Sequence, residues 1–163
     1  MLDAPAFCKW LEETYVGGSI RQSLWLFPAI ETVHLIGMAL LVATITVVDL
    51  RLLGWTRRSE RVSEVAGRLL PWAWVGFAVQ VITGVLLFSS EAVKVYGNPA
   101  FRLKLVLIFL AALHALLFRW TVYRNVASWD ESSATPLSAR ISGCISMLLW
   151  AGIVTAGRFI GFV

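Results

Sequence analysis

The sequence contains two histidines, His34 and His114, and both lie inside long apolar segments. His34 lies about 10 residues from the start of its segment, or about 15 Å at 1.5 Å of rise per helical residue. His114 lies about 13 residues from Phe101, or about 20 Å by the same rise. Ionisable side chains at membrane depth are costly and usually have a function and a partner. We therefore expect the two histidines to face each other near the middle of a bilayer.

Two facing imidazoles can supply both axial ligands of a b-type haem. Arg158 can pair with a haem propionate. Glu31, one turn before His34, can neutralise Arg158 or orient an imidazole. The predicted cofactor-binding residues are therefore Glu31, His34, His114 and Arg158, with the two histidines on the metal. Small residues nearby would leave room for a flat macrocycle: Gly37, Gly76, Gly84, Ala111, Ala112 and Ala115.

The same residues allow other interpretations. Glu31, His34 and His114 would form a two-histidine, one-carboxylate site for a single metal ion. A di-iron site is not expected, because it needs two Glu-x-x-His motifs and two further glutamates, and the chain has one motif. In the third interpretation no cofactor is bound, and the polar groups only join helices through hydrogen bonds worth about 1 kcal/mol each.

The elements that must position these residues are four apolar segments. The chain of 163 residues is 58% apolar and 15% charged, with a mean hydropathy of +0.76. Soluble domains are about half apolar and a quarter charged, and about 20 mostly apolar residues cross a bilayer as a helix. Hydropathy predicts spans at about 20–50, 66–90, 100–123 and 138–162. We therefore predict an all-α, polytopic integral membrane four-helix bundle, a single domain over residues 1–163.

Local signals refine this prediction. Ser19 and Gln22 have the spacing of a capping box that opens the first span, and Pro28 predicts a bend in that span. Asn98 and Pro99 predict the N-cap and the first residue of the third helix. The first 16 residues are amphipathic and lack the apolar core of a signal peptide. They predict an N-terminal interfacial helix that lies along the membrane surface.

The remaining polar residues have simpler predicted roles. We expect Lys104 to extend outward to the lipid headgroups, and Asp49 to anchor the topology at the inner end of its helix. Gln80 and Thr83 are expected to be hydrogen-bonded core groups. The two cysteines, Cys8 and Cys144, fall near opposite membrane faces, so no disulfide is expected between them.

Charge predicts the orientation and the partners. Eight basic residues lie in or beside the connections after the first and third spans, against six on the other side. This bias predicts cytoplasmic connections and periplasmic N and C termini. Anionic lipid accounts for the net charge of +4, and no basic surface domain is present to bind nucleic acid. The lipid-facing surface of four helices also permits a homo-oligomer.

Three stretches resemble a family of bacterial four-helix inner-membrane proteins known mainly as a domain of unknown function: Glu31–Gly37, Gly97–Lys104 and Ala156–Arg158. The resemblance covers nearly the whole chain and implies a bacterial plasma (inner) membrane, but no activity. The architecture is also similar in outline to small b-type cytochrome bundles, which typically carry four histidines for two haems. Because this chain has two histidines, its single haem would need a quinone or a redox partner protein to complete an electron path.

Three functions are consistent with these features. The first is a b-type haem protein for electron transfer or redox sensing, with His34 and His114 as ligands. The second is a proton- or ion-conducting or transporter subunit, whose path would use Glu31, His34, His114 and Arg158. The third is a structural accessory subunit of a membrane complex. An enzymatic role would be limited to that of an oxidoreductase subunit, since no Gly-x-Ser-x-Gly, phosphate-loop or His-Glu-x-x-His motif is present.

Overall fold

The computed structural model describes residues 4–56, 59–130 and 135–162, and these residues form helices and short connections without a strand. Four helices are long and apolar enough to cross a membrane. They are α3 (Leu26–Leu52), α4 (Val62–Ser90), α6 (Pro99–Thr121) and α7 (Leu137–Phe159). The predicted all-α bundle is confirmed, and the chain is a multi-pass membrane protein.

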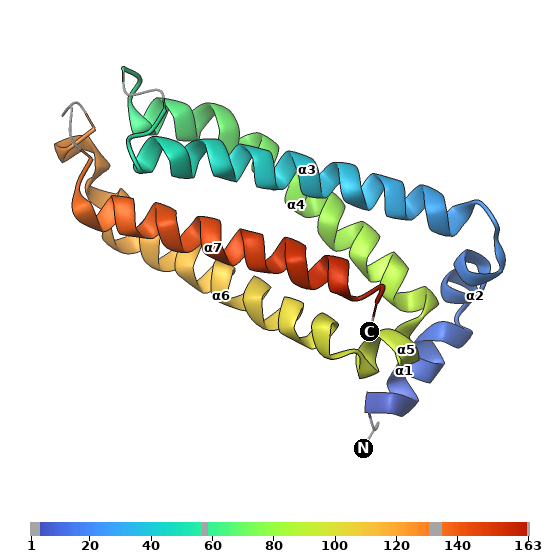
Figure 1. The fold of residues 1–163 in the computed structure, drawn as a ribbon. Coiled ribbons are helices and arrows are strands. Elements are labelled where there is room, and N and C mark those ends of the chain that lie inside the picture. The colour runs from blue at the N-terminus through green and yellow to red at the C-terminus, as the bar shows by residue number, and fades with distance from the viewer. Residues whose placement is uncertain (1–3, 57–58, 131–134, 163) are drawn as a thin grey trace.

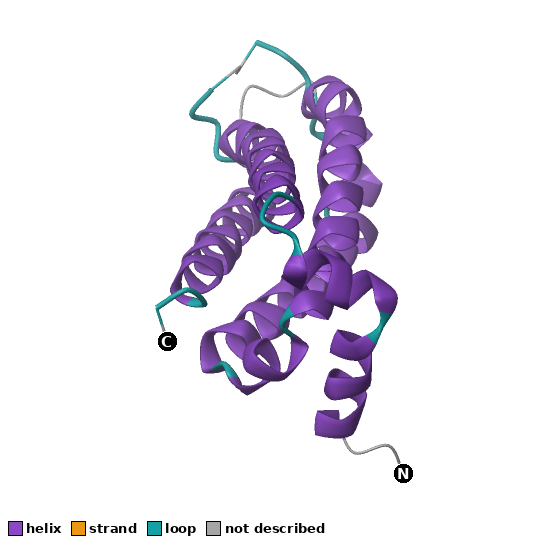
Figure 2. Cartoon of the chain, turned by 90° about the vertical axis from the view of Figure 1, so that its right-hand side faces the viewer, coloured by secondary structure: helices purple, strands orange, loops and turns teal. Residues whose placement is uncertain are grey.

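The long helices form two antiparallel pairs (Figure 1). α3 packs against α4 and α6 packs against α7, while α3 and α7 join the two pairs. One end of the bundle, here called the terminal end, holds both chain ends and three short helices: α1 (Ala4–Glu13), α2 (Tyr15–Gln22) and α5 (Ala92–Gly97). The opposite end, here called the loop end, holds the α3–α4 connection and the 3-10 helix η1 (Tyr123–Ser128). Figure 2 shows the molecule from the terminal end.

Two glycines allow α3 and α4 to approach closely. A Cβ atom on Gly76 would lie 2.9 Å from the backbone nitrogen of Leu41 and 3.0 Å from the carbonyl oxygen of Gly37. A Cβ atom on Gly37 would lie 2.6 Å from Cγ1 of Val79. Small residues at such crossings let backbones approach where the hydrophobic effect cannot drive association. The α3–α4 pair is therefore held by close backbone contact.

The first membrane helix begins later than its capping box predicts. Instead of opening a long helix at Ser19, the chain forms the separate helix α2, and α3 begins at Leu26. The Ser23 hydroxyl accepts the backbone N–H of Leu26 at 3.2 Å in the turn before α3, whose N-cap, Trp25, makes no side-chain cap hydrogen bond. The predicted start is wrong because α2 packs on the end of α4, where a Cβ on Gly17 would lie 2.5 Å from the carbonyl oxygen of Ser89.

Two other local predictions have different outcomes. Pro28 falls in the first turn of α3, where no intrahelical hydrogen bond is lost, so the basis for the predicted bend is absent. The predicted start of α6 is confirmed, because the Asn98 side chain accepts the N–H groups of Ala100 and Phe101 at 2.9 and 3.3 Å. Asn98 also donates from Nδ2 to the carbonyl oxygen of Ile160 at 3.1 Å, which ties α6 to the end of α7.

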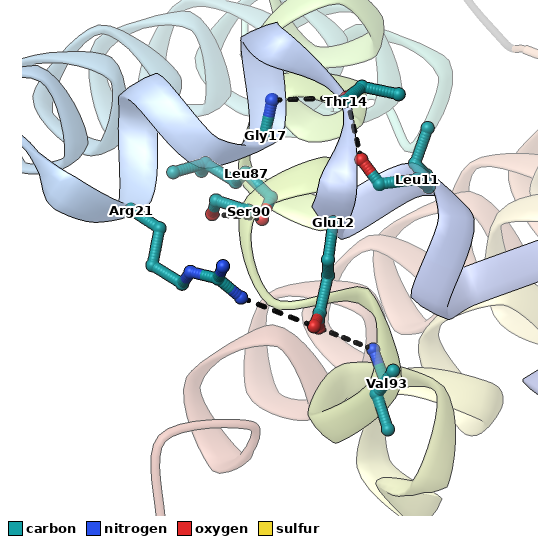
Figure 3. Close-up of polar contacts among 8 residues, drawn as sticks. All are labelled: Leu11, Glu12, Thr14, Gly17, Arg21, Leu87, Ser90 and Val93. Carbon is teal, nitrogen blue, oxygen red and sulfur yellow. Dashed lines mark hydrogen bonds and ion pairs between the residues drawn. The ribbon is translucent and has the colours of Figure 1, made fainter.

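The predicted N-terminal interfacial segment consists of two helices, α1 and α2, which cover the terminal ends of α4 and α5. Glu12 joins these elements: Oε1 accepts the N–H of Val93 at 2.8 Å, and Oε2 lies 3.4 Å from Nη1 of Arg21 (Figure 3). Large exposed hydrophobic side chains surround this end of the bundle, as is typical of a membrane interface; they include Trp10, Tyr15, Leu24 and Trp25.

Candidate functional site

His34 lies between α3 and α4 in the half of the bundle nearer the terminal end. Its Nδ1 atom is 2.7 Å from Oγ1 of Thr83. The Thr83 hydroxyl directs its single proton to the carbonyl oxygen of Val79 at 2.5 Å. We therefore assign Nδ1 of His34 as the donor and Nε2 as the unprotonated nitrogen. This hydrogen bond fixes the tautomer and leaves the Nε2 lone pair available to a ligand or a proton.

Two further contacts hold the His34 backbone and ring. The Gln80 side chain donates to the backbone carbonyl oxygen of His34. A Cβ atom on Gly84 would lie 3.5 Å from Cε1 of the imidazole, so the ring lies over this glycine. As predicted, Gln80 and Thr83 are hydrogen-bonded within the bundle.

Lys104 of α6 belongs to the same region, which was not predicted. The Lys104 side chain lies along α7, because a Cβ on Gly157 would be 3.4 Å from its Nζ and 3.6 Å from its Cε. The residue is half-buried and lies within electrostatic range of the His34 imidazole. Its Nζ lies beside Gly157, two residues before the end of α7 at Phe159, because the missing side chain there leaves room for it. The expected extension of Lys104 toward the lipid headgroups stays a prediction. We call His34, Gln80, Thr83 and Lys104 the terminal site.

His114 lies between α6 and α7, nearer the loop end. Its Nε2 atom is 3.1 Å from both the carbonyl oxygen and the Oγ atom of Ser142. Because a carbonyl oxygen can only accept, we assign the proton to Nε2 and leave Nδ1 unprotonated. His114 and His34 therefore contact different helix pairs.

The two histidines also lie at different depths. Ser142 precedes Gly143, where a Cβ atom would lie 3.1 Å from the carbonyl oxygen of Asp49. Asp49 follows His34 by about 15 residues, or about 22 Å of helix. Lys104, near His34, precedes His114 by about 10 residues, or about 15 Å. The prediction of two facing histidines at one depth is therefore wrong, because helix packing places them about 15 Å or more apart along the bundle axis.

Glu31 and Arg158 are not brought together. Both residues are exposed, and no ion pair within the described part of the chain joins them. The Arg158 guanidinium instead lies 5.2 Å from the centre of the Phe162 ring. No group of three His, Cys, Asp or Glu side chains that could hold a metal occurs in residues 4–56, 59–130 and 135–162. The predicted set Glu31, His34 and His114 is therefore not assembled.

Asp49 is a second residue whose position was not predicted. Its exposed fraction is 4%, although it carries a carboxyl group. Ser146 of α7 hydrogen-bonds to this carboxyl group, while the Oδ2 atom has no hydrogen-bond partner in the described part of the chain. Ser142 and Ser146 are one turn apart on α7, so one face of this helix connects His114 with Asp49. We call these four residues the loop site. Besides His114, its signals in the sequence were the Ser-x-x-x-Ser spacing and an aspartate inside an apolar segment.

A family model matches residues 7–163, a range that includes both sites. The chain belongs to DUF6644, a family of unknown function. This membership confirms the resemblance to a four-helix family of unknown function, and DUF6644 itself supplies no activity. Neither the curated proteins nor the solved structures contain a significant match to the chain.

An apolar layer separates the two sites of this DUF6644 chain. Leu41 on α3 and Ile153 on α7 each have an exposed fraction of 4%. They lie about 8 and 10 residues from the contact between Asp49 and Gly143, or about 12 and 15 Å along their helices. The hydroxyl of nearby Thr44 donates to a backbone carbonyl oxygen of its own helix. The bundle thus has one polar site toward each end and a packed apolar middle.

Proposed function

We propose that the chain is a proton-conducting subunit of a bacterial plasma membrane, in which the terminal site and the loop site bind the proton in turn. The observation that carries the proposal is that Lys104 is half-buried against α7 and within electrostatic range of His34. Lys104 forms no ion pair with another residue of the described ranges, although it is half-buried in a membrane helix. Such groups are retained in membrane bundles where they bind or relay charge.

The hydrogen bonds of the two histidines support this chemistry. Each imidazole has one nitrogen that donates a hydrogen bond and one that can accept a proton. An imidazole in this state can take a proton on one side and release one on the other. Two imidazoles separated by about 15 Å or more can serve successive proton sites, whereas they cannot ligate one iron atom.

The orientation follows from charge. We propose that the loop end faces the cytoplasm and that both termini are periplasmic, because the basic residues are more numerous around the loop-end connections. The apolar layer at Leu41 and Ile153 would then keep the periplasmic and cytoplasmic sites from connecting continuously. Proton movement would require this layer to open or to admit water.

Proton flux into liposomes tests the proposal. The purified protein is reconstituted with a pH-sensitive dye inside the vesicles, and a potassium diffusion potential drives the protons. We expect flux above that of protein-free vesicles, and its loss in Lys104→Met. Arg102→Met is the matched control, because Arg102 lies on the same helix but is exposed and donates to the carbonyl oxygen of Tyr96. Flux in Lys104→Met equal to that of the parent would refute the proposal, provided both variants elute as the parent does.

A second candidate function is that of a b-type haem protein for electron transfer or redox sensing. The observation that favours it is the free Nε2 lone pair of His34 beside Gly84, which suits an iron ligand. In this proposal His34 alone supplies a histidine ligand, and a quinone or redox partner protein completes the electron path. A haem spectrum lost in His34→Ala and kept in His114→Ala would support it. A colourless protein from haem-supplemented cells, or a spectrum that survives His34→Ala, would contradict it.

A further inference from the structure

We propose that Asp49 is a proton-binding carboxylic acid, which receives its proton from His114 along the Ser142–Ser146 face of α7. This inference deepens the proposed proton conduction and rests on it for its physiological meaning. The binding site itself stands on separate observations. It also changes the role predicted for Asp49, from an anchor of topology to a site that gains and loses a proton.

Burial and incomplete hydrogen bonding carry the inference. Asp49 has an exposed fraction of 4%, and its Oδ2 has no hydrogen-bond partner among the residues that the structure describes. Within residues 4–56, 59–130 and 135–162, the group that hydrogen-bonds to this carboxyl is Ser146. An ionised carboxylate in such a place lacks both water and a compensating cation, which is strongly unfavourable. A protonated carboxyl is neutral and has an O–H donor of its own, so the closed site favours the acid.

Two arginines at the loop end bond to other groups than Asp49, and a third is exposed. Arg51 is buried, and its Nε atom donates to the backbone carbonyl oxygen of Glu60 at 2.8 Å. Arg68 forms an ion pair with the Glu60 carboxylate. Arg140, one turn before Gly143 on α7, is exposed. On the side of α6, the titratable group of this region is His114, which reaches α7 through Ser142.

The position of Asp49 suits proton exchange with the loop end. Asp49 lies three residues before the end of α3 at Leu52, or about one helical turn. Gly143 lets α7 approach this turn, since a Cβ there would lie 3.1 Å from the Asp49 carbonyl oxygen. A small opening of the α3–α7 contact would therefore admit water to the carboxyl group.

The transfer step is balanced in protons and charge. His114 takes up a proton at Nδ1 and releases one from Nε2 to Ser142, so the imidazole is neutral before and after. The serine hydroxyls each accept one proton and pass one on, and the Asp49 carboxylate gains the last proton. Release of that proton to water at the loop end restores the carboxylate. No oxidant, reductant or other reactant is needed.

Labelling with dicyclohexylcarbodiimide tests whether Asp49 is protonated. This apolar reagent adds to protonated carboxylic acids in membrane proteins and forms a stable N-acylurea without a leaving group. We expect peptide mass spectrometry to find the label on Asp49 and not on the exposed Glu31 or Glu64. Each pH unit above the titration midpoint lowers the protonated fraction about tenfold, so labelling should fall steeply in alkaline buffer. Asp49→Asn removes the labelled group, and Glu64→Gln is the matched control.

A second measurement covers the case in which the reagent cannot reach a closed site. The infrared spectrum of the parent should contain the carbonyl band of a protonated carboxylic acid, and this band should be missing in Asp49→Asn and present in Glu64→Gln. Absence of both label and band in the parent would overturn the inference. Suppression of labelling by added Na⁺ at constant pH would also overturn it, in favour of a metal-cation site.

These outcomes separate the inference from the proposed function. If Asp49 carries the label but liposomes show no proton flux, the site stands and proton conduction fails. If the flux persists in Asp49→Asn and the acid band is absent, conduction stands and the assignment of Asp49 fails. We expect instead that Asp49→Asn keeps the fold, because the amide preserves shape and hydrogen bonding to Ser146, and that it lowers flux at least about tenfold.

Discussion

Replacement of Gly76 by alanine should loosen the α3–α4 pair that positions His34 against Thr83. A Cβ atom at Gly76 would lie 2.9 Å from the backbone nitrogen of Leu41 and 3.0 Å from the carbonyl oxygen of Gly37. Since backbone atoms cannot rotate away as a side chain can, the helices must separate. Overpacking of this kind typically costs about 1–3 kcal/mol. The hydrogen bond between His34 and Thr83, at 2.7 Å, would be stretched by the same displacement.

Gly67→Ala on the same helix is the matched control, because no atom lies within 4 Å of a Cβ at Gly67. This variant gains helix propensity worth about 0.5–1 kcal/mol. Thermal unfolding in detergent, followed by circular dichroism, should lower the midpoint of Gly76→Ala and leave that of Gly67→Ala unchanged or higher. A difference of about 2–4 °C is expected for each kcal/mol in a chain of this size. Equal midpoints for the two variants would refute the close-packing argument.

Three other predictions concern the contacts that hold the sites and the ends of the helices. Thr83→Val should lower the free energy of unfolding by about 1–3 kcal/mol, because the Nδ1 donor of His34 loses its acceptor. Thr83→Ser keeps the hydroxyl and should have the stability of the parent in the same thermal unfolding experiment. Asn98→Ala should cost about 1 kcal/mol through the lost cap of α6, with equal stability of variant and parent as the contrary result. Gly17→Ala should detach α2 from Ser89, seen as faster proteolysis between α1 and α3; an unchanged digestion pattern would contradict this.

The four spans could be predicted because hydropathy and length act locally. Each long helix carries its own apolar segment, and a segment of sufficient length crosses the bilayer whichever neighbours it has. The start of α6 could be predicted for the same reason, because it depends on residues close together in the sequence. The Asn98 side chain accepts the N–H groups of Ala100 and Phe101, two and three residues later. The break between α2 and α3 could not be predicted from neighbouring residues. It depends on the contact between Gly17 and Ser89, which belong to distant parts of the chain.

The sequence predicted the histidines of the two candidate sites but not the residues that contact them. His34 and His114 stood out as ionisable groups in apolar segments, but their partners Thr83 and Ser142 did not. In a soluble protein, the apolar face of a helix identifies the side that packs inward. In a bilayer the lipid-facing side is equally apolar, so the pattern does not reveal which side chains share an interior.

The sequence by itself determined that this chain crosses a membrane four times and that costly polar groups are carried into it. The tertiary structure decided where those groups meet. It separated the two histidines, left Glu31 and Arg158 exposed, and brought Lys104 and Asp49 into the bundle. The physical reason is that crossing the membrane is set by the hydropathy of each segment. The depth and direction of a side chain are set instead by helix contacts such as that of Gly143 with Asp49.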